Sequence, residues 1–375
     1  MKYYIIAGEA SGDLHGSNLI KELKKLDNIP DIRCWGGDLM EQAGGTLVKH
    51  YRQLAFMGFI EVVKNIRTIF RNLRLCKEDI LAFKPDVIVL IDYPGFNLRI
   101  ASWAAKEEIP VIYYISPQVW AWKESRVKQI RKHVNKMLVI LPFEKEFYKK
   151  WGYEVEYVGH PLAEVINNVQ TSLEPIPETL LSPLNEKNII ALLPGSRKQE
   201  VAKKLPIMLE SSAAFPEYRF IVAKATSLDD SFYDQFMAAY PNVRSIRNKT
   251  YELLMQSKAA LVTSGTATLE TALLGVPQVV CYKGSPVSYE IAKRLIRVKY
   301  ISLVNLIMDK EVIKELIQHE LTADNVKKEL SRILNDQQAI RQIAADYAAL
   351  KNILEEDGQA SQKAAAIIYH YIRDH

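Results

Sequence analysis

Short apolar runs alternate with helical patterns along most of the chain. Six runs rich in β-branched and aromatic residues predict strands in the first half, at Lys2–Ala7, Ile32–Trp35, Asp86–Asp92, Val111–Ser116, Met137–Leu141 and Val155–Val158. Helical spacing is found between most of them, at Asp13–Leu26, Glu61–Phe83, Leu98–Lys106, Glu124–His133 and Phe143–Trp151. This alternation predicts a parallel sheet with helices on both faces.

The alternation stops and then returns. Between Asn167 and Asn188, proline, serine and threonine interrupt any period, which indicates an interdomain linker. Strands are predicted again at Ile189–Leu193, Arg219–Val222, Val243–Ile246, Ala259–Thr263 and Gln278–Cys281. Helices are predicted at Lys198–Leu209, Ser231–Ala239, Thr250–Gln256, Ala267–Leu274 and Ser288–Ile296. After Leu303 we expect helix to the end, including Thr322–Asn335, Ala339–Glu356 and Ala360–Arg373.

The predicted fold class is α/β, with two facing Rossmann-like domains. The chain has 375 residues, more than one typical domain. We expect an N-terminal domain at 1–167, a linker at 168–187, a C-terminal nucleotide-binding domain at 188–340, and helices at 341–375 that return to the first domain. Ligands of such domains bind at the carboxyl ends of the strands.

Composition excludes some classes of site. No stretch approaches the ~18 consecutive apolar residues of a membrane-spanning helix, so we expect a cytoplasmic protein. The three cysteines, Cys34, Cys76 and Cys281, lie far apart and have no adjacent histidine pair, which predicts buried thiols and no metal site. The net charge of +5 decides nothing by itself.

The segment Ala259–Gly275 predicts an anion site. A buried strand leads through Ser264, Gly265 and Thr266 into a helix, whose first N–H groups lack partners within the helix. Glu270, one turn into that helix, can accept hydrogen bonds from a ribose. The alternative is an ordinary strand–turn–helix with a solvated glutamate. The residues expected to bind the ligand here are Ser264, Gly265, Thr266, Ala267, Thr268 and Glu270.

Arg197 follows the first strand of the second half, in Leu193-Pro194-Gly195-Ser196-Arg197. A guanidinium there can hold a diphosphate oxygen and support a leaving group. A solvated surface arginine is the alternative. Since parallel strands end at one edge of a sheet, Arg197 and the turn at Gly265 are expected to bind one molecule.

Two stretches of the first half carry candidate chemistry. Gly8, Ser11, Gly12 and Asp13 follow the first strand and suit a phosphate or sugar, although GxxxG is not the dinucleotide motif and Asp13 can instead cap a helix. Asp92 ends the predicted strand Asp86–Asp92, where a general base would be placed and burial would raise its pKa. An Asx-turn carboxylate is the alternative for Asp92.

A basic and apolar helix indicates contact with a lipid. The apolar run around Phe56–Ile60 precedes basic residues that recur at helical spacing, among them Arg67, Arg71 and Arg74. Trp120 and Trp122 precede a second basic stretch, and a buried tryptophan pair is the alternative there. No pattern typical of nucleic-acid binding accompanies the charge.

Taken together, six segments resemble the motifs of the lipid-A-disaccharide synthase family, in that family's order and over nearly the whole chain. They are Gly8–Asp13, Asp92–Asn97, Ser116–Trp122, Gly159–Pro161, Leu193–Arg197 and Ser264–Glu270. The resemblance implies a GT-B hexosyltransferase on the cytoplasmic face of the inner membrane of Gram-negative bacteria. It also implies transfer from UDP-2,3-diacylglucosamine to 2,3-diacylglucosamine 1-phosphate (lipid X), forming a β-1,6 bond and releasing UDP without a cofactor.

The resemblance also implies residue roles. Asp92 would take the proton of the acceptor hydroxyl, with Glu9 or His15 as substitutes. Arg197 and the N–H groups of residues 266–268 would stabilise UDP, Glu270 would bind the ribose, and Asn305 would face the nucleotide. The residues expected to contact acyl chains, phosphate or membrane are Phe56, Met57, Phe59, Ile60, Arg67, Arg71 and Arg74.

Two other classes of function remain open from the sequence. One is another UDP-sugar enzyme of this architecture, either a UDP-N-acetylglucosamine 2-epimerase or a peptidoglycan glycosyltransferase. The second is a noncatalytic UDP-sugar-binding membrane scaffold, which would have no use for Asp92. A homodimer is also left open.

Overall fold

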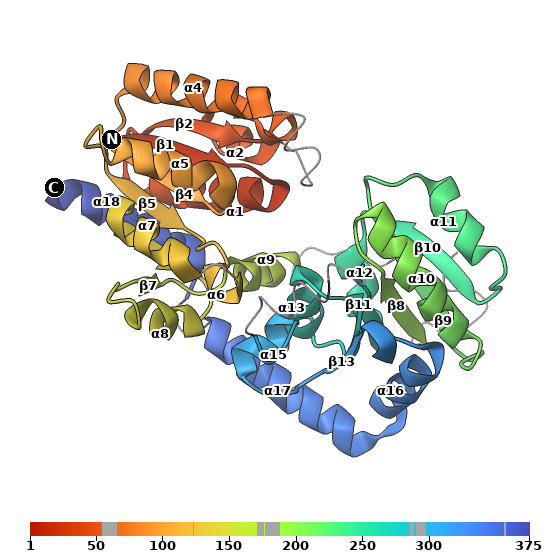
Figure 1. The fold of residues 1–375 in the computed structure, drawn as a ribbon. Helices are drawn as coiled ribbons and strands as arrows, with labels where there is room; N and C mark the ends of the chain where they lie inside the picture. The colour runs from red at the N-terminus through yellow and green to blue at the C-terminus, as the bar shows by residue number, and fades with distance from the viewer. Residues whose placement is uncertain are drawn as a thin grey trace. The chain divides into compact units, whose positions relative to one another are not determined.

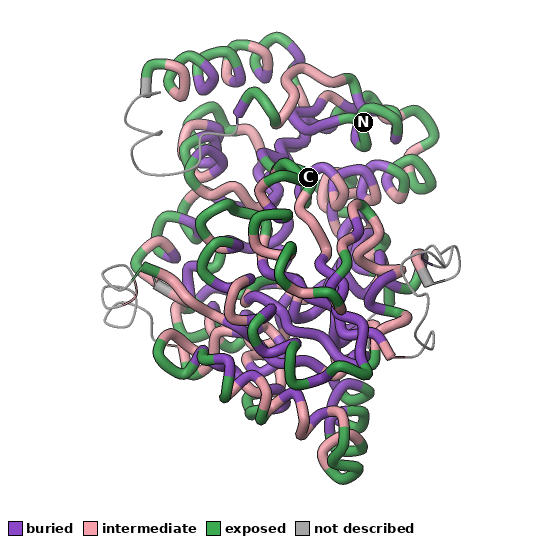
Figure 2. Tube along the Cα trace, turned by 90° about the vertical axis from the view of Figure 1, so that its right-hand side faces the viewer, coloured by how far each residue is buried: buried purple, intermediate pink, exposed green. Residues whose placement is uncertain are grey.

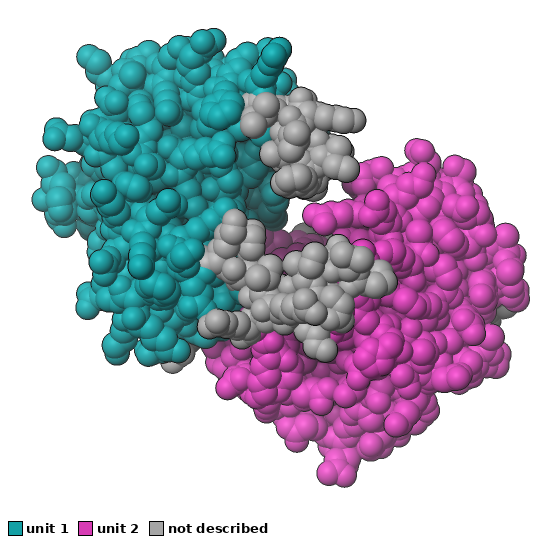
Figure 3. Space-filling view, viewed as in Figure 1, with its two compact units in different colours: residues 1–161, 354–375 teal, residues 162–353 magenta. Residues whose placement is uncertain are grey.

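The computed structural model describes residues 1–54, 66–122, 124–170, 176, 188–285, 289, 298–355 and 358–375. The chain forms two compact units: unit 1 comprises Met1–Pro161 and Leu354–His375, and unit 2 comprises Leu162–Ile353 (Figure 3). The predicted linker lies outside the described residues except for the end of one helix and Ile176. The domain boundaries expected from the sequence remain predictions.

Unit 1 is built on a seven-stranded parallel sheet (Figure 1). Its strands are β1 (Lys2–Ala7), β2 (Asp31–Gly36), β3 (Thr46–His50), β4 (Val87–Ile91), β5 (Val111–Tyr114), β6 (Lys136–Val139) and β7 (Glu156–Tyr157). They lie in the order β3-β2-β1-β4-β5-β6-β7. The central strands read as continuous apolar runs because both faces of the sheet are covered.

Helices cover both faces of this sheet. They are α1 (Ala10–Leu26), α2 (Asp38–Gln42), α4 (Ile66–Phe83), α5 (Pro94–Ala104), α6 (Val119–Trp122), α7 (Val127–His133), α8 (Phe143–Lys149) and α18 (Ala360–Asp374). Alternate residues of β1 point to opposite faces: Tyr4 shares a core with α4, α5 and α7, whereas Tyr3 shares one with α1 and α18. The expected return of the C-terminal segment to the first domain is confirmed for α18, whereas most of α17 (Gln337–Glu355) belongs to unit 2.

Unit 2 is built on a six-stranded parallel sheet in the order β10-β9-β8-β11-β12-β13. Its strands are β8 (Ile189–Leu193), β9 (Arg219–Lys224), β10 (Val243–Arg247), β11 (Ala259–Thr263), β12 (Gln278–Tyr282) and β13 (Lys314–Ile317). Its helices are α10 (Lys198–Ser212), α11 (Asp230–Met237), α12 (Thr250–Met255), α13 (Thr266–Leu273), α15 (Leu303–Met308), α16 (Ala323–Asn335) and most of α17 (Gln337–Glu355). Helix α9 (Pro161–Gln170) begins at the boundary between the units. Figure 2 marks the buried residues of both units, which include almost every residue of the central strands.

The structure contains two strands and a short helix, α2, that the sequence-based elements lack. Strand β3 was not predicted, and the prediction of continuous helix after Leu303 is wrong at β13, which pairs in parallel with β12. Both strands lie at the edge of their sheets, where a strand is only half covered and needs no apolar run. The predicted helix Ser288–Ile296 lies outside the described residues apart from Tyr289.

The strand orders fix where ligands can bind. Chain order reverses between β1 and β4 in unit 1 and between β8 and β11 in unit 2. Crevices at the carboxyl ends of such strand pairs are the usual ligand sites of open α/β sheets.

Cys34, Cys76 and Cys281 are free and buried, as predicted. Within the described ranges no helix is both long and apolar enough to span a membrane.

Candidate active site

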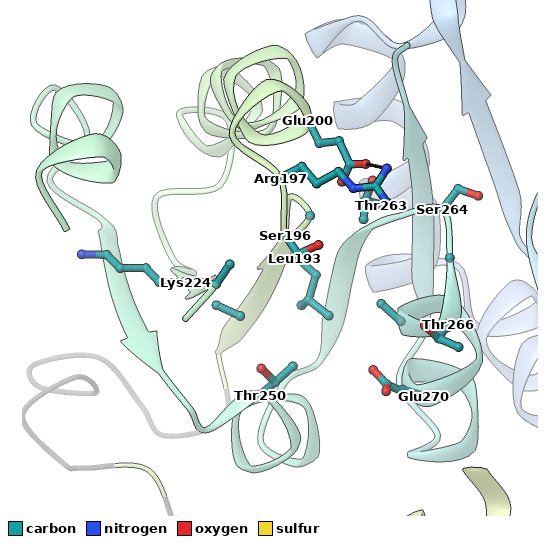
Figure 4. A pocket seen from close by; sticks show the side chains of 15 residues that line it. Leu193, Ser196, Arg197, Glu200, Lys224, Thr250, Thr263, Ser264, Thr266 and Glu270 are labelled. Atoms are coloured by element: carbon teal, nitrogen blue, oxygen red, sulfur yellow. Dashed lines mark ion pairs between the residues drawn. The ribbon is translucent and has the colours of Figure 1, made fainter. Parts of the chain in front are cut away.

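A cavity of about 540 Å³ opens at the carboxyl edge of the unit 2 sheet. Its walls come from the ends of β8, β9 and β11 and from the residues that begin α10, α12 and α13. The volume falls in the range of small-molecule sites, which is about 300–1,000 Å³. Its polar lining residues include Ser196, Arg197, Glu200, Lys224, Thr250, Thr263, Ser264, Thr266 and Glu270 (Figure 4).

One part of this cavity is suited to an anion. Gly265 precedes α13 with φ of +141°, a conformation that other residues rarely adopt, so the turn requires glycine. The first N–H groups of α13 and the helix dipole therefore bring partial positive charge to the cavity wall. Arg197 lies nearby, with its guanidinium 3.7 Å from the Glu200 carboxylate and its side chain 69% exposed (Figure 4). Both features fit a phosphate group.

A different part of the cavity is suited to a sugar hydroxyl. Glu270 points toward this part of the cavity from α13, and Thr250 lies across from Glu270 on α12 (Figure 4). The Tyr251 hydroxyl donates a hydrogen bond of 3.1 Å to the Glu270 carboxylate. Burial raises the pKa of Glu270, and this hydrogen bond opposes the rise. The carboxylate is thus oriented and keeps acceptor capacity for a diol.

Two residues expected at this site lie elsewhere. Thr268 is fully buried, and both its N–H and its hydroxyl donate to the carbonyl of Gly265, so it closes the turn from behind. Asn305 is fully buried as well, and its amide makes four hydrogen bonds, with residues Val312, Ile313 and Glu315. Neither side chain lines the cavity, and the geometry of Asn305 corrects the expectation that it faces the nucleotide.

Several lining residues were not predicted from the sequence. Glu200 is one turn into α10, Lys224 ends β9, Thr250 begins α12 and Thr263 ends β11. Lys224 and Thr263 could have been identified from the sequence because they lie at strand ends. Lys224 points away from the other labelled side chains and is paired with Asp230 and Asp234 (Figure 4).

A second cluster lies at the carboxyl edge of the unit 1 sheet. Asp92 and Tyr93 follow β4 with φ of 42° and 48°, and Ile115 follows β5 with φ of 66°. Left-handed backbone is costly for such residues and concentrates at functional sites. The Asn97 amide and the Tyr113 hydroxyl both donate to the Asp92 carbonyl, at 2.8 and 2.5 Å. These bonds hold Asp92 in its strained conformation.

Asp92 has the properties of a general base. Burial raises its pKa to about 6, and the charge of neighbouring Glu9 adds to the rise. A carboxylate of this pKa is ionised at neutral pH and still accepts a proton readily. Glu9 follows β1 as the residue that precedes α1, so the two carboxylates come from the adjacent strands β1 and β4.

His15 belongs to another group of side chains. Burial lowers its pKa to about 4, and its Nδ1 is buried without a partner among the described residues. The pKa of His160 is lowered to about 3, first by burial and then by His15. Both imidazoles are therefore neutral at pH 7, but pKa values this low make them weak bases, which suits hydrogen bonding better than proton abstraction.

The remaining residues expected after β1 differ in role. Ser11 is exposed, but Gly12 packs against Ala7 of β1. The Asp13 carboxylate is buried and accepts N–H bonds from Gly37, Leu39 and Met40, so it anchors the start of α2. Gly8 lies against the ring of Tyr93, too close for any side chain at this position. Gly8, Gly12 and Asp13 thus have packing or anchoring roles and Ser11 is exposed, and the ligand contacts expected of them remain predictions.

Comparison with known proteins decides the family. The family model described as lipid-A-disaccharide synthetase matches residues 3–369. A lipid-A-disaccharide synthase of Geobacter metallireducens is 40% identical over 97% of this chain and 95% of its own, and one of Coxiella burnetii is 36% identical over 98% of each. The chain belongs to the lipid-A-disaccharide synthase family. It is a glycosyltransferase of lipid A biosynthesis.

Solved structures support the fold of this family member. A UDP-GlcNAc 2-epimerase from Neisseria meningitidis, bound to UDP-GlcNAc, has a TM-score of 0.67 at 14% identity and covers both chains fully. The glycotransferase of kitacinnamycin has a TM-score of 0.68 at 14% identity and covers 99% of each chain. The predicted GT-B fold, with two Rossmann-like domains and a helical C-terminus, is confirmed.

The lipid-contacting region expected for this family is described only in part. Phe56, Met57, Phe59 and Ile60 lie outside the described residues. On α4, Arg67, Arg71 and Arg74 are exposed, and Phe70 among them is 60% exposed. Trp120 is buried and donates its indole N–H to Glu144, so Trp120 belongs to the protein interior, as the alternative to lipid contact expected.

Proposed function

We propose that this protein joins UDP-2,3-diacylglucosamine to 2,3-diacylglucosamine 1-phosphate with inversion at the anomeric carbon. The observation that carries the proposal is the chemistry at the two switch points of a chain in this family. The start of α13 follows β11 and Arg197 follows β8, and both suit an anion. A carboxylate with a pKa of about 6, that of Asp92, follows β4.

The proposed reaction is a single displacement. The 6-hydroxyl oxygen of the acceptor forms a bond to the donor anomeric carbon while the bond from that carbon to the diphosphate oxygen breaks. The hydroxyl proton passes to the Asp92 carboxylate, and the bonding electrons leave with UDP. One base is sufficient because an α-linked donor gives a β-linked product in one step.

The unit 2 cavity is proposed to hold the UDP part of the donor. Arg197 and the N–H groups at the start of α13 would face the diphosphate, where charge grows as the bond breaks. Glu270 would accept hydrogen bonds from the ribose diol. These interactions are strongest toward the departing diphosphate, so they favour the transition state over the bound donor.

The α4 surface is proposed to rest on the cytoplasmic face of the inner membrane. Exposed arginines flank an exposed phenylalanine on one helix, a combination that suits anionic headgroups and the acyl boundary. Both proposed substrates carry acyl chains, so such a position would bring the protein to them.

One assay tests the proposal. The purified protein is incubated with both acylated substrates, and disaccharide 1-phosphate and UDP are measured by mass spectrometry. We expect both products in equal amounts, with the β-anomer identified by NMR. Conversion of UDP-N-acetylglucosamine to its 2-epimer, with no disaccharide, would instead establish the epimerase alternative.

Asp92→Asn separates catalysis from binding in the same assay. Turnover is expected to fall about 10²- to 10⁴-fold, the usual contribution of a general base, while UDP affinity is expected to stay within twofold. Unchanged turnover would exclude Asp92 as the base and favour Glu9 or His15.

A further inference from the structure

Lys204 is a buried cation directly behind the unit 2 cavity. It lies on α10, two turns after Arg197, and is only 3% exposed. Its Nζ donates a hydrogen bond to the Thr263 hydroxyl, and no other hydrogen-bond acceptor for it is found in the described part of the chain. Burying an ammonium ion that has only one partner costs stability, so its presence calls for an explanation.

No carboxylate of the described residues forms an ion pair with Lys204. The nearest anionic group on its own helix is Glu200, whose charge favours the ammonium form, but Glu200 forms its ion pair with Arg197. Burial, the largest influence, lowers the pKa of Lys204. The charge of Lys204 is therefore only partly balanced by the described residues.

Thr263 connects Lys204 to the cavity. It ends β11, is 9% exposed and contributes to the cavity wall. Its oxygen accepts a hydrogen bond from the Lys204 ammonium group, so its own hydroxyl hydrogen can be donated elsewhere, and no hydrogen bond donated by this hydroxyl is found within the described residues. A hydroxyl polarised by an ammonium ion is a stronger donor than an ordinary threonine.

The position of Thr263 in the cavity indicates which chemical group of a ligand would contact it. It lies beside Arg197, Glu200 and Ser264, whereas Glu270 and Thr250 lie in the part of the cavity suited to the ribose (Figure 4). A donor hydroxyl backed by positive charge in that position suits an anion.

We propose that Lys204 is a positioning residue for the diphosphate of the bound nucleotide, acting through the Thr263 hydroxyl. The inference rests on the proposed function, in which this cavity holds UDP. Lys204 keeps the hydroxyl turned toward the diphosphate and contributes a buried positive charge that water cannot screen.

The test compares Lys204→Met with Lys203→Met. Both changes remove one lysine charge from α10, but Lys203 is exposed. Binding of UDP and of uridine is measured by calorimetry, together with Tm. For Lys204→Met we expect at least tenfold weaker UDP binding, uridine binding within twofold, and an unchanged or higher Tm because a buried charge is removed. For Lys203→Met we expect all three quantities to stay close to the wild type.

Thr263→Val tests the connection. It removes the hydroxyl at nearly constant volume and should weaken UDP binding to a similar degree. The double variant with Lys204→Met should be little weaker than either single variant, since both disrupt one interaction. Fully additive losses would overturn the proposed route through Thr263.

Two results distinguish this inference from the proposed function. If the wild type binds UDP and Lys204→Met binds it equally well, the inference is overturned and the proposed function stands. A lower Tm with unchanged UDP affinity would likewise show a purely structural lysine. If the wild type binds no UDP, the proposed function is wrong and the inference falls with it.

Discussion

Asp92 combines two costs that a structural aspartate would avoid, a left-handed backbone and a buried carboxyl group. Both are retained at the strand end where chain order reverses. Because burial raises the folded-state pKa to about 6, stability is lost as the pH rises from about 4 to 6, and the full cost remains above that range. The strain and the raised pKa are the features expected of a residue that takes part in chemistry.

The pH dependence of turnover tests the role of Glu9. Asp92 must be ionised to accept a proton, so turnover should rise with pH through about 6. Glu9→Gln removes the like charge that helps to raise this pKa, so the rise should move to lower pH. The exposed residue Glu107 provides a control, and Glu107→Gln should leave the profile in place. A profile that Glu9→Gln does not move would contradict the assigned pair.

Stability provides an independent measurement on Asp92. Asp92→Asn removes the buried charge, so Tm should rise at pH 8, where the wild-type carboxylate is ionised, by an amount equivalent to about 1 kcal/mol. At pH 5 part of the difference should remain, because the unfolded-state carboxyl group is already ionised there, and the difference should nearly vanish only below about pH 4, the ordinary range of an aspartate. A variant that is less stable at both values would indicate that the carboxylate holds the loop.

Glu270 can be tested with a modified nucleotide. If its carboxylate binds the ribose diol, the wild type should prefer UDP over 2′-deoxy-UDP by about tenfold, the equivalent of one hydrogen bond to a charged group. Glu270→Gln should lose most of this preference. Tyr251→Phe, which removes only the hydrogen bond that orients Glu270, should retain more of it. Equal preference in all three proteins would place the ribose elsewhere.

At the scale of elements, the central strands were predictable and the edge strands were not. Strands β1, β8 and β11 have the predicted bounds because burial on both faces demands unbroken apolar runs. The edge strand β13 begins Lys-Glu and reads as helix. The turns at Arg197 and Gly265 were predictable because they follow such central strands.

Other parts of the site depend on contacts that sequence spacing does not encode. Lys204 lies on a helical pattern that looks ordinary, and only the packing of α10 places it behind Thr263. Asp13 anchors the separate helix α2, which was not predicted. The Asn305 side chain accepts hydrogen bonds from the loop that leads into β13, a strand that was not predicted from the sequence.

Helix α4 offers a test of membrane contact. The double variant Phe70→Ser, Arg71→Glu removes an exposed ring and reverses one charge. Binding to phosphatidylglycerol vesicles in a sedimentation assay should weaken at least tenfold, since each basic residue near an anionic surface contributes about 1 kcal/mol. Leu81→Ser, at another exposed apolar position of α4, should change binding little. Equal losses in both variants would argue against a localised contact surface.

At the scale of the whole molecule, each unit has its own sheet and core. The cavity residues all belong to unit 2, whereas Asp92 belongs to unit 1. Binding of UDP and the stability of unit 1 are thus expected to respond to different mutations.

Ile368→Ala tests this separation by calorimetry. Ile368 is fully buried on α18, in the core that it shares with α1, so the loss should be about 2–5 kcal/mol for unit 1. UDP should raise a separate transition that the variant leaves unchanged. Ile372→Ala, at a half-buried position of the same helix, should have a smaller effect. If UDP stabilised the transition that Ile368→Ala lowers, the units would not be independent.

Unit 1 is discontinuous in the sequence, and this has a consequence for biosynthesis. Leu19, Ile20 and Leu23 of α1 share a core with Ala364 and Ile368 of α18. On the ribosome these apolar side chains emerge early, but the residues that cover them are translated only after all of unit 2. The apolar side chains of α1 therefore stay exposed until α18 has been synthesised, which makes the nascent chain a natural client for a chaperone during translation.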